Sequence, residues 1–427
     1  MPEYIHWWQF PLNLVSFKLK PTFKEKFFKE AKRKFKSVQH IALFLQQKSK
    51  LYNKRITTDY RIVWYYQKKS EYIPAWVIYE ISRKIKMNLL KIEKNIEGYV
   101  STYGRLYILK PKLPIKITPE FVSLAIHGMC DGCVNKNHFA YFQKEKFGLE
   151  RIGKLFSNVF GEYKIKKYKR THYFPTIFSA IITNYFGIQT YLGKKCRIPH
   201  KILKGSKENR IATLIAALHD KGNVSGRVRF FSSNKEFLMD LAAIAKSLGY
   251  GYSISVIKQK GKMKKDAYCL SLRYDSVEKF ANDCDKLISK FPNLYPGRKL
   301  DEIRNIIKFT RRGWKQRKKF ETKKLILKAL SKEAKTALEL REIVGINLWT
   351  VYHHLQQLIE EGKVKKKKEG RQFKFQLSTT NNFNNHLPLS GSIVKIHKDQ
   401  ILPLAQSQLS ILNWNCQKWF YQRRSQM

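Results

Sequence analysis

Apolar residues recur at helical spacing in several long blocks of the chain, and shorter blocks of alternating apolar and polar residues lie between them. The clearest helical block, KENRIATLIAALHDK, follows the capping residue Ser206 and stops at Gly222. A strand (RVRFF) comes next, and the capping box SNKE at 233–236 then opens a second helix. Two further strands, YSISVIKQ and DAYCLSLRY, precede a helix that begins after Ser276. The pattern predicts a mixed α+β unit over residues 206–310.

A weaker copy of the same order precedes this unit, in residues 119–200. Its first helix has a start signal in TPE (118–120), with a cap, a proline for the first turn and an acid near the positive helix end. The helix runs through FVSLAIHGMCD and stops at Gly132. We therefore expect one structural unit used twice, over 111–205 and 206–310, with the stiff segment KPKLPIKITPE as the boundary before it.

Small residues stand where bulk is usual in the first helix of each unit: Ala125 and Gly128 in one, and two alanines in the other. Small residues let two helices approach closely. Packing side by side would bring together the helix ends, and with them Asp131 and the adjacent Asp220 and Lys221. Convergent carboxylates of this kind are typical ligands of Mg²⁺ in phosphate chemistry.

The predicted strands of the second unit have two unlike faces. In AYCLSLRY, Leu270 and Leu272 share one face with Tyr268, and the polar residues share the other. This alternation predicts a sheet that is covered by helices on one side and open on a polar, basic side. The candidate nucleic-acid contacts on the open side are Arg227, Arg229, Ser253, Ser255, Ser271 and Arg273.

The flanks differ from this middle region. Residues 1–110 read as basic helices, for which a helix-turn-helix-like unit and a plain basic bundle both fit the pattern. A basic linker, FTRRGWKQRKKF, leads to residues 320–378, whose apolar spacing resembles a winged helix-turn-helix with LWTVYHHLQQL as its recognition helix. The polar, low-complexity tail 379–427 is predicted to be disordered.

In a winged helix of this kind, two sets of residues would meet DNA, although a winged-helix module for protein contacts is the alternative. Outward-facing side chains of the recognition helix would enter the major groove, and the basic wing would contact phosphates. The first set is Trp349, Thr350, His353 and Gln356, and the second is Lys365, Lys366, Lys367, Lys368 and Arg371.

Charge points to the same kind of partner. The 427 residues hold 84 Lys and Arg against 32 Asp and Glu, a formal net charge of +52. An A/T-rich genome would enrich lysine without depleting acids, so the imbalance predicts a polyanionic partner, and double-stranded DNA fits best. No apolar stretch approaches the roughly 20 residues that span a bilayer. The start of the chain lacks the order of a signal peptide, and six cysteines are too few for a disulfide framework. We expect a cytoplasmic, free-standing monomer that does not bind membranes.

The motif LAIHGMCDG (124–132) resembles the first motif helix of the LAGLIDADG (DOD-type) homing endonucleases, in the two-repeat form of archaea and inteins. The segment from IPHKILKG to AKSLGY resembles the second repeat through almost its whole length, and the likeness covers about residues 113–308. It implies an α+β fold of two pseudo-symmetric αββαββα repeats that form a DNA-binding saddle.

The resemblance also implies roles for single residues. In that family the acid before each motif glycine holds the metal ions that drive phosphodiester hydrolysis, which corresponds to Asp131 and, in the second repeat, to Lys221. A lysine there repels Mg²⁺, and Asp220 lies one position away, about 100° around the helix. We take Asp131 and Asp220 as candidate metal ligands and Lys221 as a candidate catalytic or phosphate-binding residue. Lys299, in YPGRKLDE, is assigned a supporting role.

Three functions remain open from the sequence. By resemblance the chain is a Mg²⁺-dependent, site-specific DNA endonuclease or nickase with an impaired second centre. The missing acid at Lys221 favours a degenerate enzyme that acts as a DNA-binding regulator. An RNA-binding intron maturase is the third alternative.

Overall fold

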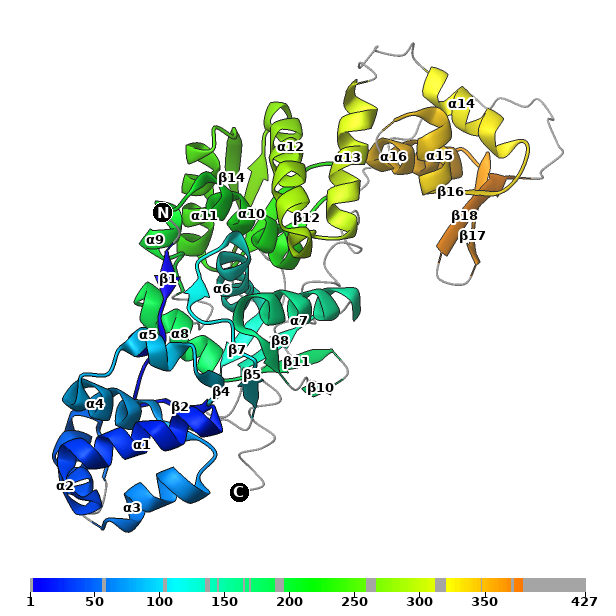
Figure 1. Cartoon of the computed structure of the whole chain (residues 1–427). Helices are drawn as coiled ribbons and strands as arrows, with labels where there is room; N and C mark the ends of the chain where they lie inside the picture. Colours follow the sequence, from blue (N-terminus) through cyan, green and yellow to red (C-terminus); the bar gives the residue numbers. More distant parts are fainter. Residues whose placement is uncertain are drawn as a thin grey trace, which may run out of the picture. The chain divides into compact units, whose positions relative to one another are not determined.

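The computed structural model describes residues 3–55, 59–102, 106–134, 139–143, 146–163, 166–168, 170–188, 196–258, 266–311, 320–346, 348–369 and 372–378 (Figure 1). The chain divides into two compact units, which hold most of residues 1–319 and most of residues 320–427 respectively. No helix among the described residues is long and apolar enough to cross a membrane.

The N-terminal region is a mixed α/β structure and not the set of basic helices expected for residues 1–110. Helices do form where the apolar spacing predicted them, but a five-stranded sheet of order β3-β2-β4-β5-β9 lies among them. The strand signal was present in VSFKL, whose residues are alternately buried and half-buried. The elements are β1 (Tyr4–Ile5), η1 (Trp7–Gln9), β2 (Val15–Leu19), α1 (Pro21–Phe35), α2 (Val38–Ser49), η2 (Lys50–Tyr52), α3 (Arg61–Trp64), η3 (Tyr65–Lys69), β3 (Ile73–Pro74), α4 (Ala75–Ile85), α5 (Leu89–Glu93), β4 (Ile96–Ser101), β5 (Tyr107–Leu109) and β6 (Ile115–Lys116).

This region is joined to the middle of the chain by backbone pairing. Strand β5 pairs with β9 (Glu162–Tyr163) of the next region, and β1 at the start of the chain pairs with β6 just before the first motif helix. One continuous core of buried residues runs from Ile5 to Ile303. The N-terminal region therefore shares its sheet and its core with the middle of the chain.

Apart from β9, which pairs with β5, the middle of the chain contains the same order of elements twice, helix–strand–strand–helix–strand–strand–helix. The first copy is α6 (Pro119–Asp131), β7 (Gly132–Val134), β8 (Phe139–Phe142), α7 (Lys146–Phe160), β10 (Lys166–Tyr168), β11 (Thr171–Phe174) and α8 (Ile177–Phe186). After α9 (His200–Leu203), the second is α10 (Lys207–Lys221), β12 (Gly222–Asn223), β13 (Arg229–Ser232), α11 (Lys235–Ser247), β14 (Tyr252–Ile257), β15 (Ala267–Leu272) and α12 (Tyr274–Lys290).

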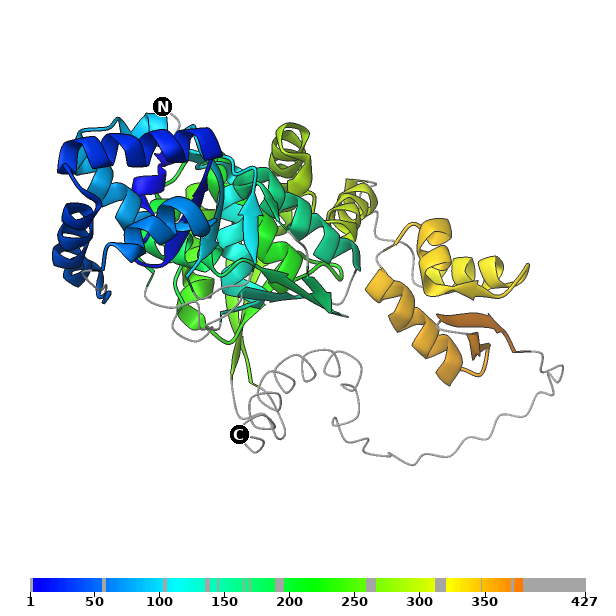
Figure 2. The same cartoon turned by 60° about the horizontal axis from the view of Figure 1, so that its bottom comes forward.

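The two copies also share one sheet topology. The strand orders are β10-β11-β8-β7 in the first copy and β14-β15-β13-β12 in the second, so corresponding strands occupy corresponding places. All of these pairings are antiparallel. The short strand after each motif helix, β7 or β12, is the element that the apolar pattern alone did not predict. Figure 2 shows the β14–β15 hairpin (green) extending beyond the helices of its copy.

Helices α6 and α10 pack against each other in the middle of this unit (Figure 1). Their small residues lie in the core: Ala125, Ala212 and Ala216 are fully buried. Close approach through small residues is the geometry that the sequence predicted. It brings the C-terminal ends of both helices to one place, with η4 (Pro292–Leu294) and α13 (Arg298–Arg311) following the second copy.

The glycine after each motif helix is required by space and not by backbone conformation. Gly132 and Gly222 have the same extended backbone, with φ of −85° in both. A Cβ at Gly222 would lie 2.3 Å from the Leu218 carbonyl oxygen, and one at Gly132 would lie 2.4 Å from the Gly128 carbonyl oxygen. The chain can leave the helix and enter a strand at once only because no side chain is present there.

The winged helix-turn-helix consists of α14 (Glu321–Leu330), β16 (Lys335–Thr336), α15 (Ala337–Val344), α16 (Leu348–Glu360), β17 (Val364–Glu369) and β18 (Gln372–Leu377). Its sheet has the order β16-β18-β17. Val351, Leu355 and Leu358 of α16 are buried, as their spacing predicted. Ile343, near the end of α15, is 56% exposed.

Some sequence-based predictions fall on residues that the structure does not describe. Arg371 and the tail 379–427 lie outside the described residues, as does the linker segment 312–319. The backbone of Trp349 lies in α16, but its side chain is not among the described ones.

Substitution of the second motif glycine tests the close approach at the helix end. We expect Gly222→Ala to lower the free energy of unfolding by about 1–3 kcal/mol, because the new methyl group overlaps a backbone carbonyl that cannot move freely. Gly251→Ala is the matched control, since a Cβ there meets only the flexible side chain of Arg273. Urea unfolding followed by circular dichroism measures both, and equal stability of the two variants would contradict the packing argument.

Candidate functional site

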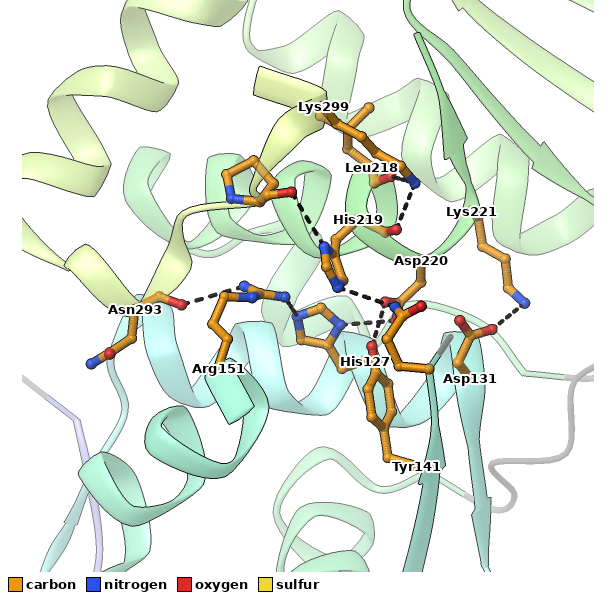
Figure 3. A network of polar contacts seen from close by, with 12 residues as sticks. His127, Asp131, Tyr141, Arg151, Leu218, His219, Asp220, Lys221, Asn293 and Lys299 are labelled. Atoms are coloured by element: carbon orange, nitrogen blue, oxygen red, sulfur yellow. Dashed lines mark hydrogen bonds and ion pairs between the residues drawn. The ribbon is translucent and has the colours of Figure 1, made fainter. Parts of the chain in front are cut away.

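An ion pair joins the last residues of the two motif helices. Asp131 ends α6 and Lys221 ends α10, and Lys221 Nζ lies 2.6 Å from Asp131 Oδ1 (Figure 3). The side chains are partly accessible, with 18% of Asp131 and 34% of Lys221 exposed. The carboxylate that the sequence analysis assigned to a metal is thus neutralised by an ammonium group from the other repeat.

The surroundings set the charge of this pair. Burial and the negative charge of Asp220 raise the pKa of Asp131 to about 6, and the Lys221 ammonium opposes that rise. Burial lowers the pKa of Lys221, but Asp131, Cys130 and Asp220 together raise it by more, so that it lies above its ordinary value. At neutral pH both groups are therefore ionised.

Asp220 faces the interior instead of sharing the place of Lys221. Its side chain is fully buried. The Tyr141 hydroxyl donates to Oδ1 at 2.6 Å, and Nδ1 of His127 donates to Oδ2 at 2.8 Å (Figure 3). Burial raises the pKa of Asp220, whereas the hydrogen bond from Tyr141 and the charge of Lys221 lower it. Both carboxylate oxygens are thus engaged by groups of the first repeat.

The chain of contacts continues through His127 to a buried arginine. Arg151, on α7, donates from Nη2 to Nε2 of His127 at 3.3 Å and from Nη1 to the Asn293 carbonyl at 3.3 Å. Burial and the charge of Arg151 hold the pKa of His127 well below its usual range, so the ring is neutral. His127 is thus a packed, hydrogen-bonded histidine.

Lys299 acts on the helix end and not on the ion pair. Its ammonium donates to the carbonyl oxygens of Leu218 at 2.9 Å, His219 at 2.6 Å and Gly222 at 2.8 Å (Figure 3). These carbonyls lie where α10 ends, and the Leu218 oxygen also accepts from the Gly222 amide. A cation there offsets the negative end of the helix dipole. Lys299 thus caps the end of α10 from α13, and its supporting role in the site stays a prediction.

The residues at this junction do not fit a Mg²⁺ centre. Mg²⁺ needs carboxylate oxygens that are free to replace some of its waters. Asp131 is bound to an ammonium group, and both oxygens of Asp220 are bound inside the protein. Among the described residues, no group of three or more His, Cys, Asp or Glu side chains is placed to hold a metal ion.

Tyr141 and Arg151, which hold Asp220 and His127 in place, were not predicted from the sequence. Tyr141 lies in the short strand β8 and Arg151 lies on α7, and both elements belong to the first repeat. The only signal for them in the sequence was the charge of Arg151 among the apolar residues of α7. Tyr141 of β8 meets Asp220 near the end of α10 only in the folded chain.

The open face of the second sheet carries a row of polar side chains. Backbone pairing aligns Asn223, Arg229, Ser271 and Ser253 across all four strands. Arg229 Nη2 donates to Ser225 Oγ at 2.9 Å and to Asn223 Oδ1 at 3.3 Å, so the guanidinium is held in place. The neighbouring Phe230, Leu270 and Leu272 are buried against the helices.

The other predicted contacts of this sheet lie around the row. Ser255 is exposed and pairs with Cys269. Arg227 and Arg273 are exposed, but each lies outside its strand, next to one end. Asn223, which helps to hold Arg229, was not among the predicted contacts because β12 was not predicted.

The corresponding row in the first sheet has different chemistry. Cys133 pairs with Ala140, and Ala140 pairs with Tyr173, so Ala140 occupies the place that Arg229 has in the second repeat. The next pair toward the end of β8 is Phe142 with Thr171. In the described part of this face, small and aromatic side chains therefore occupy the places that hydrogen-bonding side chains have in the second sheet.

The winged helix presents the residues that the sequence assigned to DNA. His353 and Gln356 are exposed on α16 and Thr350 is half-buried. Lys365, Lys366, Lys367 and Lys368 are all exposed on β17, and Lys366 Nζ lies 4.0 Å from the centre of the Phe373 ring.

Comparison with known proteins identifies one segment by sequence. Residues 321–366 match the family model described as "Bacterial regulatory protein, arsR family", a helix-turn-helix. No curated protein matches the chain. The C-terminal module is thus a helix-turn-helix of a regulatory type.

Three solved structures are similar to parts of the chain. A mesophilic variant of the homing endonuclease I-DmoI has 14% identity and a TM-score of 0.29, over 39% of this chain and 94% of that one. I-DmoI in complex with DNA and Ca has 14% identity and a TM-score of 0.29, over 38% and 87%. Full-length DUF199/WhiA from Thermatoga maritima has 12% identity and a TM-score of 0.28, over 57% and 91%.

Removal of the buried carboxylate tests the junction. We expect Asp220→Ala to lower the free energy of unfolding by about 3–5 kcal/mol, because it leaves the buried Arg151 without a counter-charge and Tyr141 without its acceptor. Tyr141→Phe removes one hydrogen bond only and should cost about 1 kcal/mol. Urea unfolding gives both values. An Asp220→Ala variant as stable as Tyr141→Phe would show that the carboxylate does not hold the repeats together.

Proposed function

We propose that this protein is a sequence-specific duplex-DNA-binding regulator, built on two LAGLIDADG-type repeats and a winged helix, that does not cut its site. The observation that carries the proposal is the 2.6 Å contact between Lys221 and Asp131 at the junction of the motif helices. Metal-dependent hydrolysis of a phosphodiester needs free carboxylates at that place. The chain has filled it with an internal ion pair.

The ion pair and the Asp220 network favour the regulator over the endonuclease. A divalent ion would have to displace the Lys221 ammonium and would still find Asp220 bonded to Tyr141 and His127. The exposed part of Lys221 faces outward with a positive charge, which suits a DNA phosphate. The junction would then support binding where the related enzymes carry out hydrolysis.

Two surfaces and the net charge of the chain support binding to duplex DNA. The helix-turn-helix segment matches a regulatory family, and its wing exposes four consecutive lysines. The open sheet face of the second repeat offers Arg229, which is held by neighbouring polar groups. The net charge of +52 supplies sequence-independent attraction to phosphates.

The unlike sheet faces suggest an asymmetric target. A fixed arginine fits the O6 and N7 acceptors of guanine, so Arg229 would read a G·C pair. Phe142 of the first repeat, which shares the face of Ala140 and is 37% exposed, instead suits the methyl group of thymine. We therefore expect the half-site under the second repeat to contain guanine and the other to be A·T-rich.

Cleavage is tested on supercoiled plasmids that carry fragments selected by binding to the native protein. We expect no nicked or linear product from the native protein with Mg²⁺ or Mn²⁺, because Asp131 is neutralised. Lys221→Glu restores a second acid at the junction and should produce metal-dependent nicking or cutting, whereas Lys221→Glu combined with Asp131→Ala should not. Product from the native protein that disappears in Asp131→Ala would overturn the regulator and favour the endonuclease.

DNA binding is tested through its salt dependence, measured by fluorescence anisotropy on a selected duplex. Replacing Lys365, Lys366, Lys367 and Lys368 by glutamine should lower the slope of log affinity against log salt by about 0.9 for each phosphate that the variant no longer neutralises. The control replaces four exposed lysines of α1, Lys26, Lys29, Lys32 and Lys34, with the same change in net charge. An equal decrease in both variants would mean that the wing has no special role, and tighter binding to a structured RNA than to the duplex would favour the maturase.

A further inference from the structure

A cluster of aromatic side chains lies exposed on the N-terminal region, away from the groups discussed so far. Tyr60 is 56% exposed, Trp64 is 47% exposed and Tyr65 is 49% exposed. We call these three residues the aromatic patch. Large aromatic side chains are usually buried in large part. Three of them exposed between positions 60 and 65 therefore indicate a surface for a partner.

Local backbone structure holds the aromatic patch in place. Tyr60 and Trp64 are four residues apart across α3, which places them on one side of the helix. The helix then widens into the π-helix η3, where the Ser70 amide donates to the Tyr65 carbonyl at 2.8 Å. Such π-helical turns are frequent at functional sites. Val63 and Tyr66 anchor the segment in the core, so the exposed rings are carried on a fixed support.

Positive charge flanks the aromatic patch. Lys68 and Lys69 are exposed, and Lys69 Nζ lies 5.7 Å from the centre of the Trp64 ring. Lys24 of α1 donates to the Ser70 carbonyl at 2.7 Å, which brings a further cation to the end of η3. Its pKa is lowered by burial and by the neighbouring Lys68. Cations thus gather here close enough to repel one another.

Acidic groups beside the aromatic patch are already compensated. The residues from Tyr60 to Lys69 include no Asp or Glu. Asp59 is bound to Arg61, and Glu71 is bound to Lys18. The charge that remains is positive, so a partner with regular negative charge and flat apolar groups is the best match.

Unpaired nucleobases on a phosphate backbone have that chemistry. Bases stack on aromatic side chains while cations follow the phosphates, and the stacking tolerates any base. A closed duplex offers only its backbone and groove edges, because its bases already stack on one another. We propose that the aromatic patch, with Lys68 and Lys69, binds single-stranded DNA. The choice of DNA rests on the proposed function, in which the other surfaces of the chain bind DNA.

The test uses the full-length protein and a 3′-fluorescein oligo(dT) of 20 nucleotides, with anisotropy as the readout. The Trp64→Leu/Tyr65→Leu variant keeps apolar bulk and removes two π-faces, and we expect its affinity to fall by about 5- to 150-fold for each base that no longer stacks. Trp64→Phe/Tyr65→Phe keeps both rings and should bind within about threefold of the native protein if stacking on aromatic faces is the source of affinity. Replacing Lys68 and Lys69 by glutamine should lower the salt slope by about 0.7 for each phosphate that they neutralise.

Leu51→Ala provides the control for exposed apolar surface. Leu51 is 71% exposed in the same region but has no aromatic face, so its removal should leave oligo(dT) binding unchanged. Circular dichroism and thermal unfolding confirm that the variants fold, as expected for exposed positions.

The outcomes separate this proposal from the proposed function. Leucine variants that bind oligo(dT) like the native protein would overturn the single-strand site, whatever happens to duplex binding. Oligo(U) that binds more tightly than oligo(dT), with the same decrease in the leucine variants, would overturn the choice of DNA in favour of RNA. Loss of oligo(dT) binding in the leucine variants together with an unchanged affinity for the selected duplex would support the proposal. A native protein that binds oligo(dT) through the patch but no duplex would sink the proposed function alone.

Discussion

Two helix C-termini converge at one buried place, and the charge that this creates has to be compensated. Each helix ends with carbonyl groups that carry partial negative charge, and the chain adds Asp131 and Asp220 at the same point. Close packing of α6 on α10 keeps water from solvating these groups fully. Lys221 on one carboxylate, Lys299 on the carbonyls of α10 and Arg151 near the other carboxylate supply the positive charge from three different elements.

This compensation also determines how the repeats are joined. Asp220 comes from the second repeat, and its partners Tyr141 and His127 come from the first. Arg151 extends the connection to the carbonyl of Asn293, in the segment after the second repeat. A divalent ion would supply the same charge, but it could leave and would need water around it. Internal cations instead supply this charge from residues of the chain itself.

The remaining surfaces divide recognition among unlike parts of one chain. The second sheet has a fixed arginine in a polar row, whereas the first has an alanine at the same place. The wing of the C-terminal module exposes lysines, and the N-terminal region exposes aromatic rings along α3 and at the start of the π-helix η3. Each surface suits a different feature of a nucleic acid, namely base edges, phosphates or unpaired bases.

The sequence by itself determined the repeated unit, the winged helix and the lysine at position 221, where the family that it resembles has an acid. Periodicity and caps show where helices begin, as at Ser206 and Thr118, because these signals act within a few residues. Alternation in β15 predicted which face is buried for the same reason. Small residues in both helices placed Asp131 at the junction, and the family resemblance then implied its role as a metal ligand.

Only the tertiary structure decided what those residues do there. Asp220 could take the place of Lys221 beside Asp131 only if its side chain pointed toward Asp131. The direction of the Asp220 side chain follows from its contacts with Tyr141 and His127, which lie 79 and 93 residues earlier in the chain. The sheet in the N-terminal region is likewise completed by β9. This strand begins at Glu162, 53 residues after β5 ends at Leu109. Charges and strands that meet across such separations are paired by folding, and the local pattern of the sequence contains no record of the pairing.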